Sequence, residues 1–298
     1  MFFQLEENRY CYRVVPIEHL KDLEAEIEER RREGILPEAL DRNYIGRFVF
    51  EPPPDFQGAR SLIVMAAPRP PYQAVFHWKG REHRLLVPVT YSFYGETLEQ
   101  MEGQINVLLS RFGHRAVLAR LPCKLLAVRS GLAFYGRNNI TYIPGMGSYF
   151  QLAAFYSDLP AETDPFKDHQ IAPDCQECSA CLNSCPTGAI SLERFRVRTE
   201  LCMAYYSENA GEFPSWLRYS PLECLIGCAR CQEVCPMNIH LLGWVGGMQE
   251  FSEEETRVLM AGDLELSPSG GAIKEKLALL GVQDAIEFFP RNIKAALE

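Results

Sequence analysis

The stretch Cys175-Gln-Glu-Cys178-Ser-Ala-Cys181-Leu-Asn-Ser-Cys185-Pro186 has the spacing C-x2-C-x2-C-x3-C-P of bacterial ferredoxins. In that pattern the first three cysteines ligate one [4Fe–4S] cluster, and the fourth ligates a second cluster. Zinc sites use one or two C-x2-4-C pairs and do not need the fourth spacing. The stretch therefore predicts [4Fe–4S] clusters rather than zinc or buried structural thiols.

A second, shorter run is expected to complete the pattern. It reads Cys228-Ala-Arg-Cys231-Gln-Glu-Val-Cys235-Pro236, which is one cysteine short of a full run. Cys202 and Cys224 are the candidates for the missing ligand, and spacing alone leaves both open. Under the crossing rule cluster I takes Cys175, Cys178, Cys181 and Cys235. Cluster II takes Cys185, Cys228, Cys231 and one of the two candidates. Two adjacent clusters favour electron transfer, with a purely structural role as the alternative.

The composition is that of a globular protein with a sizeable core: 298 residues, 47% hydrophobic and 23% charged. That length suits one large domain or two modest ones. The net charge is −9, from 30 basic and 39 acidic residues. A chain this acidic has no general electrostatic attraction to nucleic acid or to anionic membranes.

The cysteine distribution and the N-terminus indicate the compartment. Only Cys11 and Cys123 lie outside residues 175–235. The N-terminus is acidic where a signal peptide needs Lys or Arg, and no apolar run approaches the roughly 20 residues that span a bilayer. We expect a cytoplasmic protein that contacts no membrane. In that reducing compartment metal binding explains the cysteines better than disulfides do.

Residues 1–165 show an alternation of strands and helices that is typical of a layered α/β sheet. Apolar residues at helical spacing predict one helix that ends near Gly34 and another over residues 98–112 that ends at Gly113. Continuous apolar runs predict buried strands at residues 61–67 and 150–156. A strand followed by a helix is expected over residues 115–128. Residues 166–245 are expected to be rich in loops and short helices, and residues 246–298 to be helical.

Residues 129–149 combine glycines, aromatic residues and hydrogen-bonding side chains. The glycines would let the backbone approach a large flat ligand closely, although a tight turn explains the same composition equally well. The segment has neither the G-K-[ST] of a P-loop nor the G-x-G-x-x-G of a dinucleotide site.

Four groups of residues resemble the epoxyqueuosine reductase family over about residues 60–240. They are the first run extended through Thr187-Gly188-Ala189-Ile190, the second run extended through Pro236-Met237-Asn238, the segment 129–138, and residues 147–148 with 157–160. The resemblance implies an α+β fold, in which a nitroreductase-like α/β domain that binds cobalamin precedes a ferredoxin-like domain with two [4Fe–4S] clusters. The expected domains are residues 1–165 for the first, 166–245 for the second, and 246–298 as a short helical C-terminal extension.

The resemblance also assigns individual residues. It implies that Cys202 completes cluster II and that Cys224 is spare, so that the metal ligands are Cys175, Cys178, Cys181, Cys185, Cys202, Cys228, Cys231 and Cys235. It implies that residues 129–149 line the cobalamin. The residues expected to bind it are Arg129, Gly131, Tyr135, Gly136, Arg137, Asn138, Asn139, Gly145, Gly147 and Ser148.

The chain departs from the family pattern in two places. Where the family has an Asp-Thr-Ala-Pro-like segment with a presumed proton-donating Asp, residues 119–124 read Ala-Arg-Leu-Pro-Cys-Lys. The C-terminal helical-repeat extension that is associated with tRNA is absent or replaced by residues 246–298. Together with the acidic composition, these departures predict a divergent paralogue for which tRNA is an unlikely partner.

A different proton donor is then needed, and three tyrosines are candidates for this catalytic role: Tyr91, Tyr94 and Tyr135. A nearby cation such as Lys79, Arg81 or Arg84 would lower the pKa of a tyrosine and favour proton delivery. His77 and His83 are weaker candidates. Each tyrosine alone is more often an ordinary core or rim residue.

Two functions follow from these patterns. The first is an oxidoreductase that passes electrons from an external low-potential donor through two [4Fe–4S] clusters to a bound cobalamin, for a reductive reaction on an unknown small-molecule substrate. The alternative is a non-catalytic electron-transfer protein that reduces a redox partner protein, such as a corrinoid protein.

Overall fold

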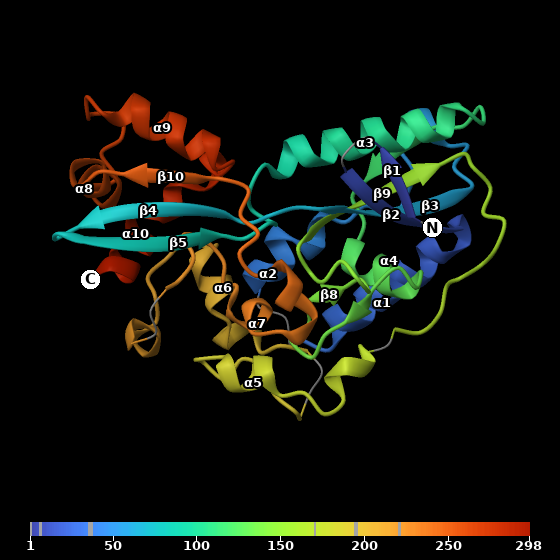
Figure 1. The fold of residues 1–298 in the computed structure, drawn as a ribbon. Coiled ribbons are helices and arrows are strands. Elements are labelled where there is room, and N and C mark those ends of the chain that lie inside the picture. Colours follow the sequence, from blue (N-terminus) through green and yellow to red (C-terminus); the bar gives the residue numbers. More distant parts are fainter. Residues whose placement is uncertain (1, 6–7, 35–37, 170, 194–195, 220–221) are drawn as a thin grey trace. The chain divides into compact units, whose positions relative to one another are not determined.

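The computed structural model describes residues 2–5, 8–34, 38–169, 171–193, 196–219 and 222–298 (Figure 1). The chain forms two compact units. Unit 1 contains residues 1–68 and 95–177, and unit 2 contains residues 69–94 and 178–298. Within the described ranges no helix has both the length and the apolar character needed to cross a bilayer.

The centre of unit 1 is a five-stranded antiparallel sheet in the order β1-β2-β3-β9-β6. Its strands are β1 (Phe2–Leu5), β2 (Asn8–Pro16), β3 (Ser61–Pro68), β6 (Ala116–Ala119) and β9 (Phe150–Ser157). Val64 of β3 lies opposite Ala154 of β9, and both strands are buried along almost their whole length. Continuous apolar runs are what a strand needs when both faces of its sheet are covered, so the predictions for β3 and β9 are confirmed.

The helices of this unit are α1 (Leu20–Arg32), α2 (Glu38–Asn43), α3 (Tyr94–Ser110) and α4 (Cys123–Arg129). Two of them, α3 and α4, pack on the sheet. Met101, Ile105 and Leu109 of α3 pack into one core cluster with Ile63 and Phe155 of the sheet, while α4 packs against β3 and β9. The predicted stops are confirmed, since Gly34 and Gly113 both adopt positive φ just beyond their helices. A hairpin of β7 (Phe134–Tyr135) and β8 (Thr141–Tyr142) and the 3-10 helices η1 (Ile17–His19), η2 (Ile45–Arg47), η3 (Pro54–Phe56) and η4 (Pro173–Cys175) complete the unit.

Unit 2 contains a three-stranded sheet in the order β10-β4-β5. The strands are β4 (Tyr72–Trp78), β5 (Arg81–Val87) and β10 (Met248–Phe251), and β10 pairs parallel to β4. The helices α8 (Glu253–Ala261), α9 (Gly270–Leu279) and α10 (Phe289–Leu297), with the 3-10 helix η8 (Gln283–Phe288), share a core cluster with this sheet. The tail after residue 246 is therefore mainly helical as predicted, but it begins with a strand that the sequence reading missed.

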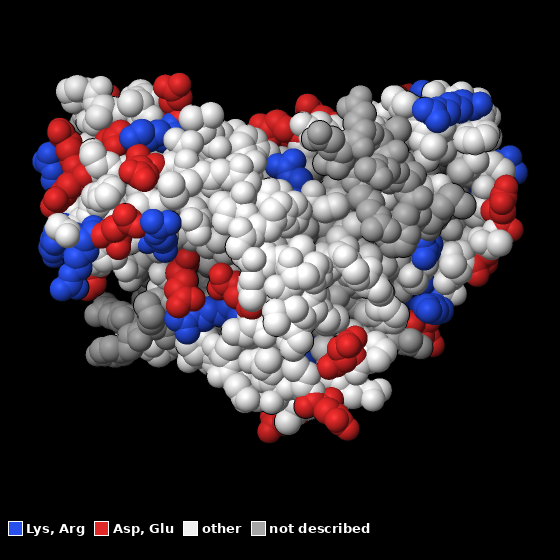
Figure 2. All heavy atoms as spheres, in the orientation of Figure 1, with Lys and Arg blue, Asp and Glu red and all other residues white. Residues whose placement is uncertain are grey.

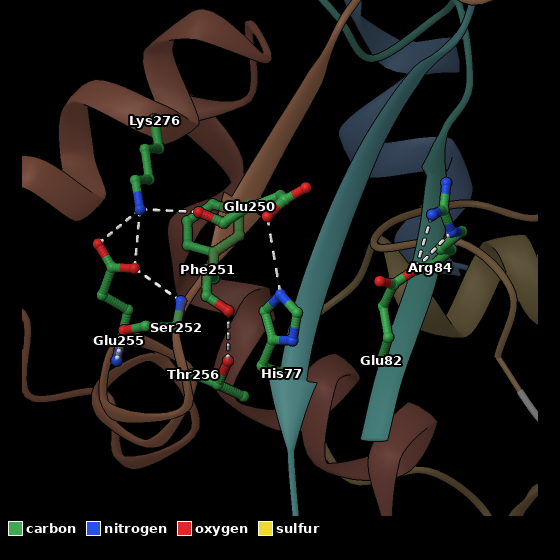
Figure 3. A network of polar contacts seen from close by, with 9 residues as sticks. All are labelled: His77, Glu82, Arg84, Glu250, Phe251, Ser252, Glu255, Thr256 and Lys276. Atoms are coloured by element: carbon green, nitrogen blue, oxygen red, sulfur yellow. Dashed lines mark hydrogen bonds and ion pairs between the residues drawn. The ribbon is translucent and has the colours of Figure 1, made fainter. Parts of the chain in front are cut away.

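Polar contacts connect the strand β10 to the helices α8 and α9 (Figure 3). The hydroxyl of Ser252 accepts from the backbone N–H of Glu255, and the Glu255 carboxylate accepts from the backbone N–H of Ser252. The ammonium of Lys276 on α9 lies 2.8 Å from both Glu255 oxygens and donates to the carbonyl of Glu250. This capping box fixes the start of α8 directly after β10.

The cysteine-rich part of unit 2 consists of short elements, as predicted for a region held by metal. They are α5 (Ala180–Ser184), η5 (Thr199–Leu201), α6 (Met203–Ser207), η6 (Ser215–Tyr219), α7 (Arg230–Glu233) and η7 (Pro236–Leu241). The helices α5 and α7 carry the two cysteine runs and pack against each other. The predicted boundaries at residues 165 and 245 stay predictions. The compact units divide the chain differently, because β4 and β5 pair with β10.

Candidate functional site

Three of the predicted cluster II ligands stand at the ends of short helices in unit 2. Cys185 follows the last residue of α5, Cys202 is the N-cap of α6, and Cys228 lies two residues before α7. At these positions backbone N–H groups reach the sulfur atoms: those of Ala204 and Tyr205 reach Cys202, and that of Arg230 reaches Cys228. Hydrogen bonds to sulfur are one of the means by which proteins stabilise bound iron–sulfur clusters.

The three thiols are also close enough to interact electrostatically. Burial raises the pKa of the Cys202 thiol, and repulsion from Cys185 adds to that effect. Burial likewise raises the pKa of Cys228 to about 11, with Cys202 and Cys185 contributing. Burial also acts to raise the pKa of Cys185, but hydrogen bonds from Thr187, Ala189 and Ile190 outweigh it and lower the pKa. The fold thus gathers Cys185 from the first run with two cysteines that follow it, as the crossing rule requires.

Cys224 has different surroundings. Its backbone forms a parallel bridge with Leu86 of β5, and its side chain is 3% exposed. Burial raises the pKa of its thiol well above the ordinary value, and Cys228 adds repulsion. Both candidates for the eighth ligand therefore lie near Cys228, and Cys202 also interacts with Cys185. The contact with Cys185 favours Cys202.

The predicted cluster I ligands straddle the division between the units. Cys175 ends η4 in unit 1, whereas Cys178, Cys181 and Cys235 belong to unit 2. All eleven cysteines are free thiols, and sets of four thiolates are the ligands that [4Fe–4S] clusters take. Across the described ranges no three His, Cys, Asp or Glu side chains converge in the way that ligands of a single metal ion do.

The segment 129–149, which is predicted to line a cobalamin, contacts the start of the first cysteine run within unit 1. The guanidinium of Arg137 donates to the carbonyl oxygens of Cys175 (2.6 Å) and Gln176 (3.4 Å). The carbonyl of Tyr135 accepts from the N–H of Ala172. The same backbone that forms β7 therefore also positions the first cluster cysteine.

Part of this segment is a tight turn held by its own side chains. The amide of Asn138 donates to the hydroxyl of Tyr142 (2.8 Å), and its oxygen accepts from the N–H of Ile140. A Cβ added at Gly136 would lie 2.6 Å from both Asn138 and Tyr142, so no side chain fits there. Asn139 adopts a positive φ of 61° at the tip of the turn. Asn138 and Gly136 therefore shape the turn.

Other members of the predicted cobalamin set lie elsewhere on the segment. Arg129 forms an ion pair with Asp168 (2.9 Å), and its guanidinium lies over the ring of Phe166. Gly131 and Gly145 have positive φ, and nothing lies within 4 Å of a Cβ added at Gly145. Gly147 and Ser148 are buried. None of these assignments is tested by the fold, and they stay predictions.

The three candidate tyrosines are not gathered in one unit. Tyr91 and Tyr94 belong to unit 2 and Tyr135 to unit 1. Tyr94 is 52% exposed, and the hydroxyl of Tyr91 donates to Glu208 (2.8 Å). Burial raises the pKa of Tyr135 to about 12, even though Arg30 acts in the opposite direction. The expected lowering by a cation is therefore overcome by desolvation at Tyr135.

The cations expected beside these tyrosines make other contacts. Lys79 lies over the ring of Trp78, and Arg84 forms an ion pair with Glu82 (2.7 Å). His77 lies 3.8 Å from a carboxylate oxygen of Glu250 (Figure 3). Arg81 is exposed, and His83 is half-buried. The polar residues of the β4–β5 hairpin thus interact along their own sheet.

A cavity of about 580 Å³ lies beside α10 in unit 2. Its walls include Phe213, Leu217, Leu222, Arg291 and Lys294. Arg291 donates to the carbonyls of Tyr206, Asn209 and Gly211, so its role there is structural. Sequence reading missed this cavity, because its walls come from separated segments that share no motif.

Charged side chains of both signs are interspersed on the visible face of the molecule (Figure 2). Ion pairs in unit 2 include Arg84–Glu82, Lys274–Glu265 and Lys276–Glu255.

Comparison with known proteins gives matches to the cysteine region and to the chain at large. Residues 174–238 match the family described as a 4Fe-4S double cluster binding domain, which confirms the prediction of two [4Fe–4S] clusters. The epoxyqueuosine reductase of Pseudomonas aeruginosa is 32% identical over 182 residues, which are 60% of this chain and 47% of that protein. The chain spans about half the length of the first curated relatives that it matches.

Solved structures show a similar fold. The epoxyqueuosine reductase of Bacillus subtilis, solved with its catalytic loop swung out of the active site, has a TM-score of 0.62 at 22% identity; the match covers 96% of this chain and 77% of that one. A second epoxyqueuosine reductase structure, also at a TM-score of 0.62, has 21% identity and covers 98% of this chain and 77% of that one. It was solved with a tRNA stem loop modified with epoxyqueuosine. The expectation that tRNA is an unlikely partner therefore lacks support.

Proposed function

We propose that this chain, which resembles the epoxyqueuosine reductases, is a cobalamin-dependent iron–sulfur reductase. The observation that carries the proposal is the contact between Arg137 and the carbonyl of Cys175 (2.6 Å). It ties the segment predicted to hold the cofactor to the first ligand of a double-cluster domain. The comparisons do not favour the alternative of a non-catalytic electron carrier, and we do not adopt it.

In the proposed site, this chain's own residues hold the cofactors. The eight cysteines of the two crossed runs, with Cys202 as the eighth, would ligate the clusters, which supply single electrons. Gly145 offers backbone with open space beside it, whereas the Lys167 side chain lies 3.5 Å from a Cβ added at Gly131; Asn138 and Gly136 keep the turn in shape. These residues fit a large flat ligand such as cobalamin, which would supply the strongly reducing metal centre for the reaction.

A reductive reaction on an epoxide also consumes protons. Conversion of an epoxide to an alkene takes up two electrons and two protons and releases water. Among the three tyrosines we favour Tyr135 as the donor that compensates for the missing Asp of residues 119–124, because it lies in the proposed cofactor segment. Burial raises its pKa to about 12, which keeps the hydroxyl protonated at neutral pH but makes it a weak acid.

The substrate that the relatives' names favour is epoxyqueuosine, either in tRNA or as a smaller molecule. Because the net charge is −9, binding of a tRNA stem loop would depend on specific contacts rather than on general attraction. A small epoxide would need no such contacts. The two forms of substrate can therefore be separated by presenting each of them.

The test is an anaerobic assay of protein reconstituted with iron, sulfide and cobalamin and supplied with a chemical low-potential reductant. We expect mass spectrometry to show loss of one oxygen from an epoxyqueuosine-modified tRNA stem loop or from the free epoxyqueuosine nucleoside, and no loss without cobalamin. Tyr135→Phe is expected to lower turnover at least tenfold while iron and cobalt contents stay unchanged. If neither substrate loses oxygen although iron and cobalt are bound, the proposed substrate class is wrong.

A further inference from the structure

The segment 69–94 supports the loop that leads to Cys228, although it lies far from it in the sequence. The N–H of Leu86 donates to the carbonyl of Glu223, and the N–H of Leu225 donates to the carbonyl of Leu86, both at 2.8 Å. These two bonds place Cys224 beside β5 as an isolated parallel bridge with Leu86. The second cysteine run is thus attached to the edge of the β4–β5 hairpin.

Tyr91, just beyond β5, occupies the space beside the residue that precedes Cys228. A Cβ added at Gly227 would lie 2.4 Å from the ring of Tyr91, and Gly227 adopts a φ of +75°. The backbone N–H of Gly227 donates to the buried hydroxyl of Ser207 (2.7 Å). Only glycine satisfies both the ring contact and the positive φ, so the turn before Cys228 is shaped around Tyr91.

The hydroxyl of Tyr91 reaches the other side of the same ligand set. It donates to a carboxylate oxygen of Glu208 at 2.8 Å, and both side chains are half-buried. Glu208 follows the last residue of α6, the helix that Cys202 caps, and its charge interacts with the Cys202 thiol. Tyr91, Ser207, Glu208 and Gly227, which we call the Tyr91 brace, therefore connect the Cys202 helix to the Cys228 turn.

We propose that Tyr91 and Glu208 are positioning residues of cluster II, with the ring of Tyr91 holding the Cys228 turn and the Glu208 carboxylate keeping the cluster's reduction potential low. The inference rests on the cluster assignment of the proposed function but not on cobalamin or on the substrate. Cluster potentials depend on nearby charge and on hydrogen bonding. A carboxylate close to the cluster disfavours the addition of an electron, and its removal raises the potential.

This role differs from the one that sequence reading gave to Tyr91. A proton donor must reach the substrate, whereas the Tyr91 hydroxyl is committed to Glu208 and its ring to Gly227. Substitution of a proton donor would slow turnover and leave both clusters unchanged. Substitution of a brace residue changes cluster II even when no substrate is present.

The test is a redox titration, monitored by electron paramagnetic resonance, of anaerobic full-length protein without cobalamin. Glu208→Gln keeps the shape of the side chain and removes its charge, and Glu287→Gln makes the same charge change at an exposed residue that is not part of the brace. Tyr91→Phe keeps the ring and removes the hydrogen bond, while Tyr91→Ala removes both. Cys202→Ala, which is expected to lack cluster II, identifies the signal of cluster I.

We expect Glu208→Gln to keep about eight irons and to raise the midpoint potential of cluster II alone, while Glu287→Gln changes neither cluster. Tyr91→Phe is expected to keep about eight irons and to alter the cluster II signal, and Tyr91→Ala to fall toward about four irons. The inference would be overturned if the cluster II potential of Glu208→Gln and the cluster II signal of Tyr91→Phe both matched those of the wild type. Wild-type protein with far fewer than about eight irons would instead contradict the cluster assignment beneath it.

Discussion

Cys202 and Cys224 both lie beside Cys228, and only the surroundings of each thiol separate them. Cys202 caps α6 and receives backbone N–H groups from Ala204 and Tyr205. Cys224 is held by its backbone against Leu86, is almost fully buried and receives one backbone N–H, from Ala229. The two donors at Cys202 favour it as the ligand, because amide donors stabilise a thiolate that ligates iron.

The first prediction follows from this difference. Cys202→Ala is expected to reduce the iron content from about eight to about four per chain, and Cys224→Ala to leave it at about eight. Iron and sulfide analysis of anaerobically purified variants measures both. Cys224→Ser serves as the matched control, because it keeps the size of the side chain. Loss of a cluster from Cys224→Ala but not from Cys202→Ala would reverse the assignment.

The spacing of the cysteines in the sequence and their surroundings in the fold identify different cluster ligands. Spacing in the two runs identifies seven cluster ligands, because ferredoxin ligation is local in sequence. It could not choose between Cys202 and Cys224, because that choice depends on which thiol the fold brings near Cys185. It could not find the partner of Tyr91 either, because Glu208 lies 117 residues further along the chain.

Within unit 1, the segment that leads to the cluster domain is held to α1 by His19. The two ring nitrogens of His19 face carboxylate oxygens of Asp22 (2.6 Å) and Asp164 (2.9 Å), to which the protonated imidazole donates, and the ring stacks on that of Phe166. Partial burial acts to lower the pKa of His19, but its contacts with Asp22 and Asp164 outweigh this effect and raise the pKa. The hydrogen bond to His19 lowers the pKa of Asp164.

The second prediction concerns the pH dependence of this contact. Because the pKa of His19 is higher in the folded protein than in the unfolded chain, protonation of His19 stabilises the fold. This stabilisation is complete at a pH below the unfolded-state pKa of about 6.5, and it is lost as the pH rises through the folded-state pKa. Ionised Asp164 likewise stabilises the fold at a pH above its unfolded-state pKa. That stabilisation is lost as the pH falls through its lower folded-state pKa. His19→Gln is therefore expected to cost up to about 1 kcal/mol near pH 5.5 and less near pH 8.

Urea unfolding of the wild type and His19→Gln at the two pH values measures this difference. Asp164→Asn is the matched control, because it removes the main long-range partner and keeps the imidazole. An equal cost of His19→Gln at both pH values would show that the ion pair contributes nothing to stability.

In unit 2 the capping box at Ser252 gives a prediction for one helix. Ser252→Ala removes the hydroxyl that accepts from Glu255, and it is expected to lower the free energy of unfolding by about 1 kcal/mol. Ser252→Thr retains the acceptor and should recover most of that loss. Urea unfolding measures the cost, and iron content should not change because the box lies outside the cluster region. An unchanged unfolding free energy for Ser252→Ala would contradict this role.

The helices and strands that could be predicted from the sequence are those with a strong local pattern of apolar residues. The strands β3 and β9 are continuous apolar runs, and α3 has apolar residues at helical spacing and a glycine stop, so each was identifiable. The strand β10 is short and half-exposed, and it exists because it pairs with β4. A strand that depends on a partner so distant in sequence leaves little local signal.

For the whole molecule, both compact units are built from segments that are separate in the sequence. Residues 69–94 come from the first half of the chain but belong to unit 2, where β4 and β5 form a sheet with β10. The following residues, 95–177, belong to unit 1 again and add β6 and β9 to its sheet. The predicted domains assumed contiguous segments and therefore could not assign this hairpin. Composition and motifs indicated the classes of fold and cofactor, whereas long-range pairing determines which segments carry and support the cysteines.

The most direct test of the account is metal analysis of the full-length protein, purified anaerobically, incubated with cobalamin and then separated from the excess. We predict about eight irons and about one cobalt per chain, with Arg137→Ala lowering both values because its guanidinium connects the 129–149 segment to Cys175. Arg137→Lys is expected to restore part of the loss. About eight irons with no retained cobalt, at cobalamin concentrations far above that of the protein, would contradict the central claim that this chain delivers its electrons to a bound cobalamin.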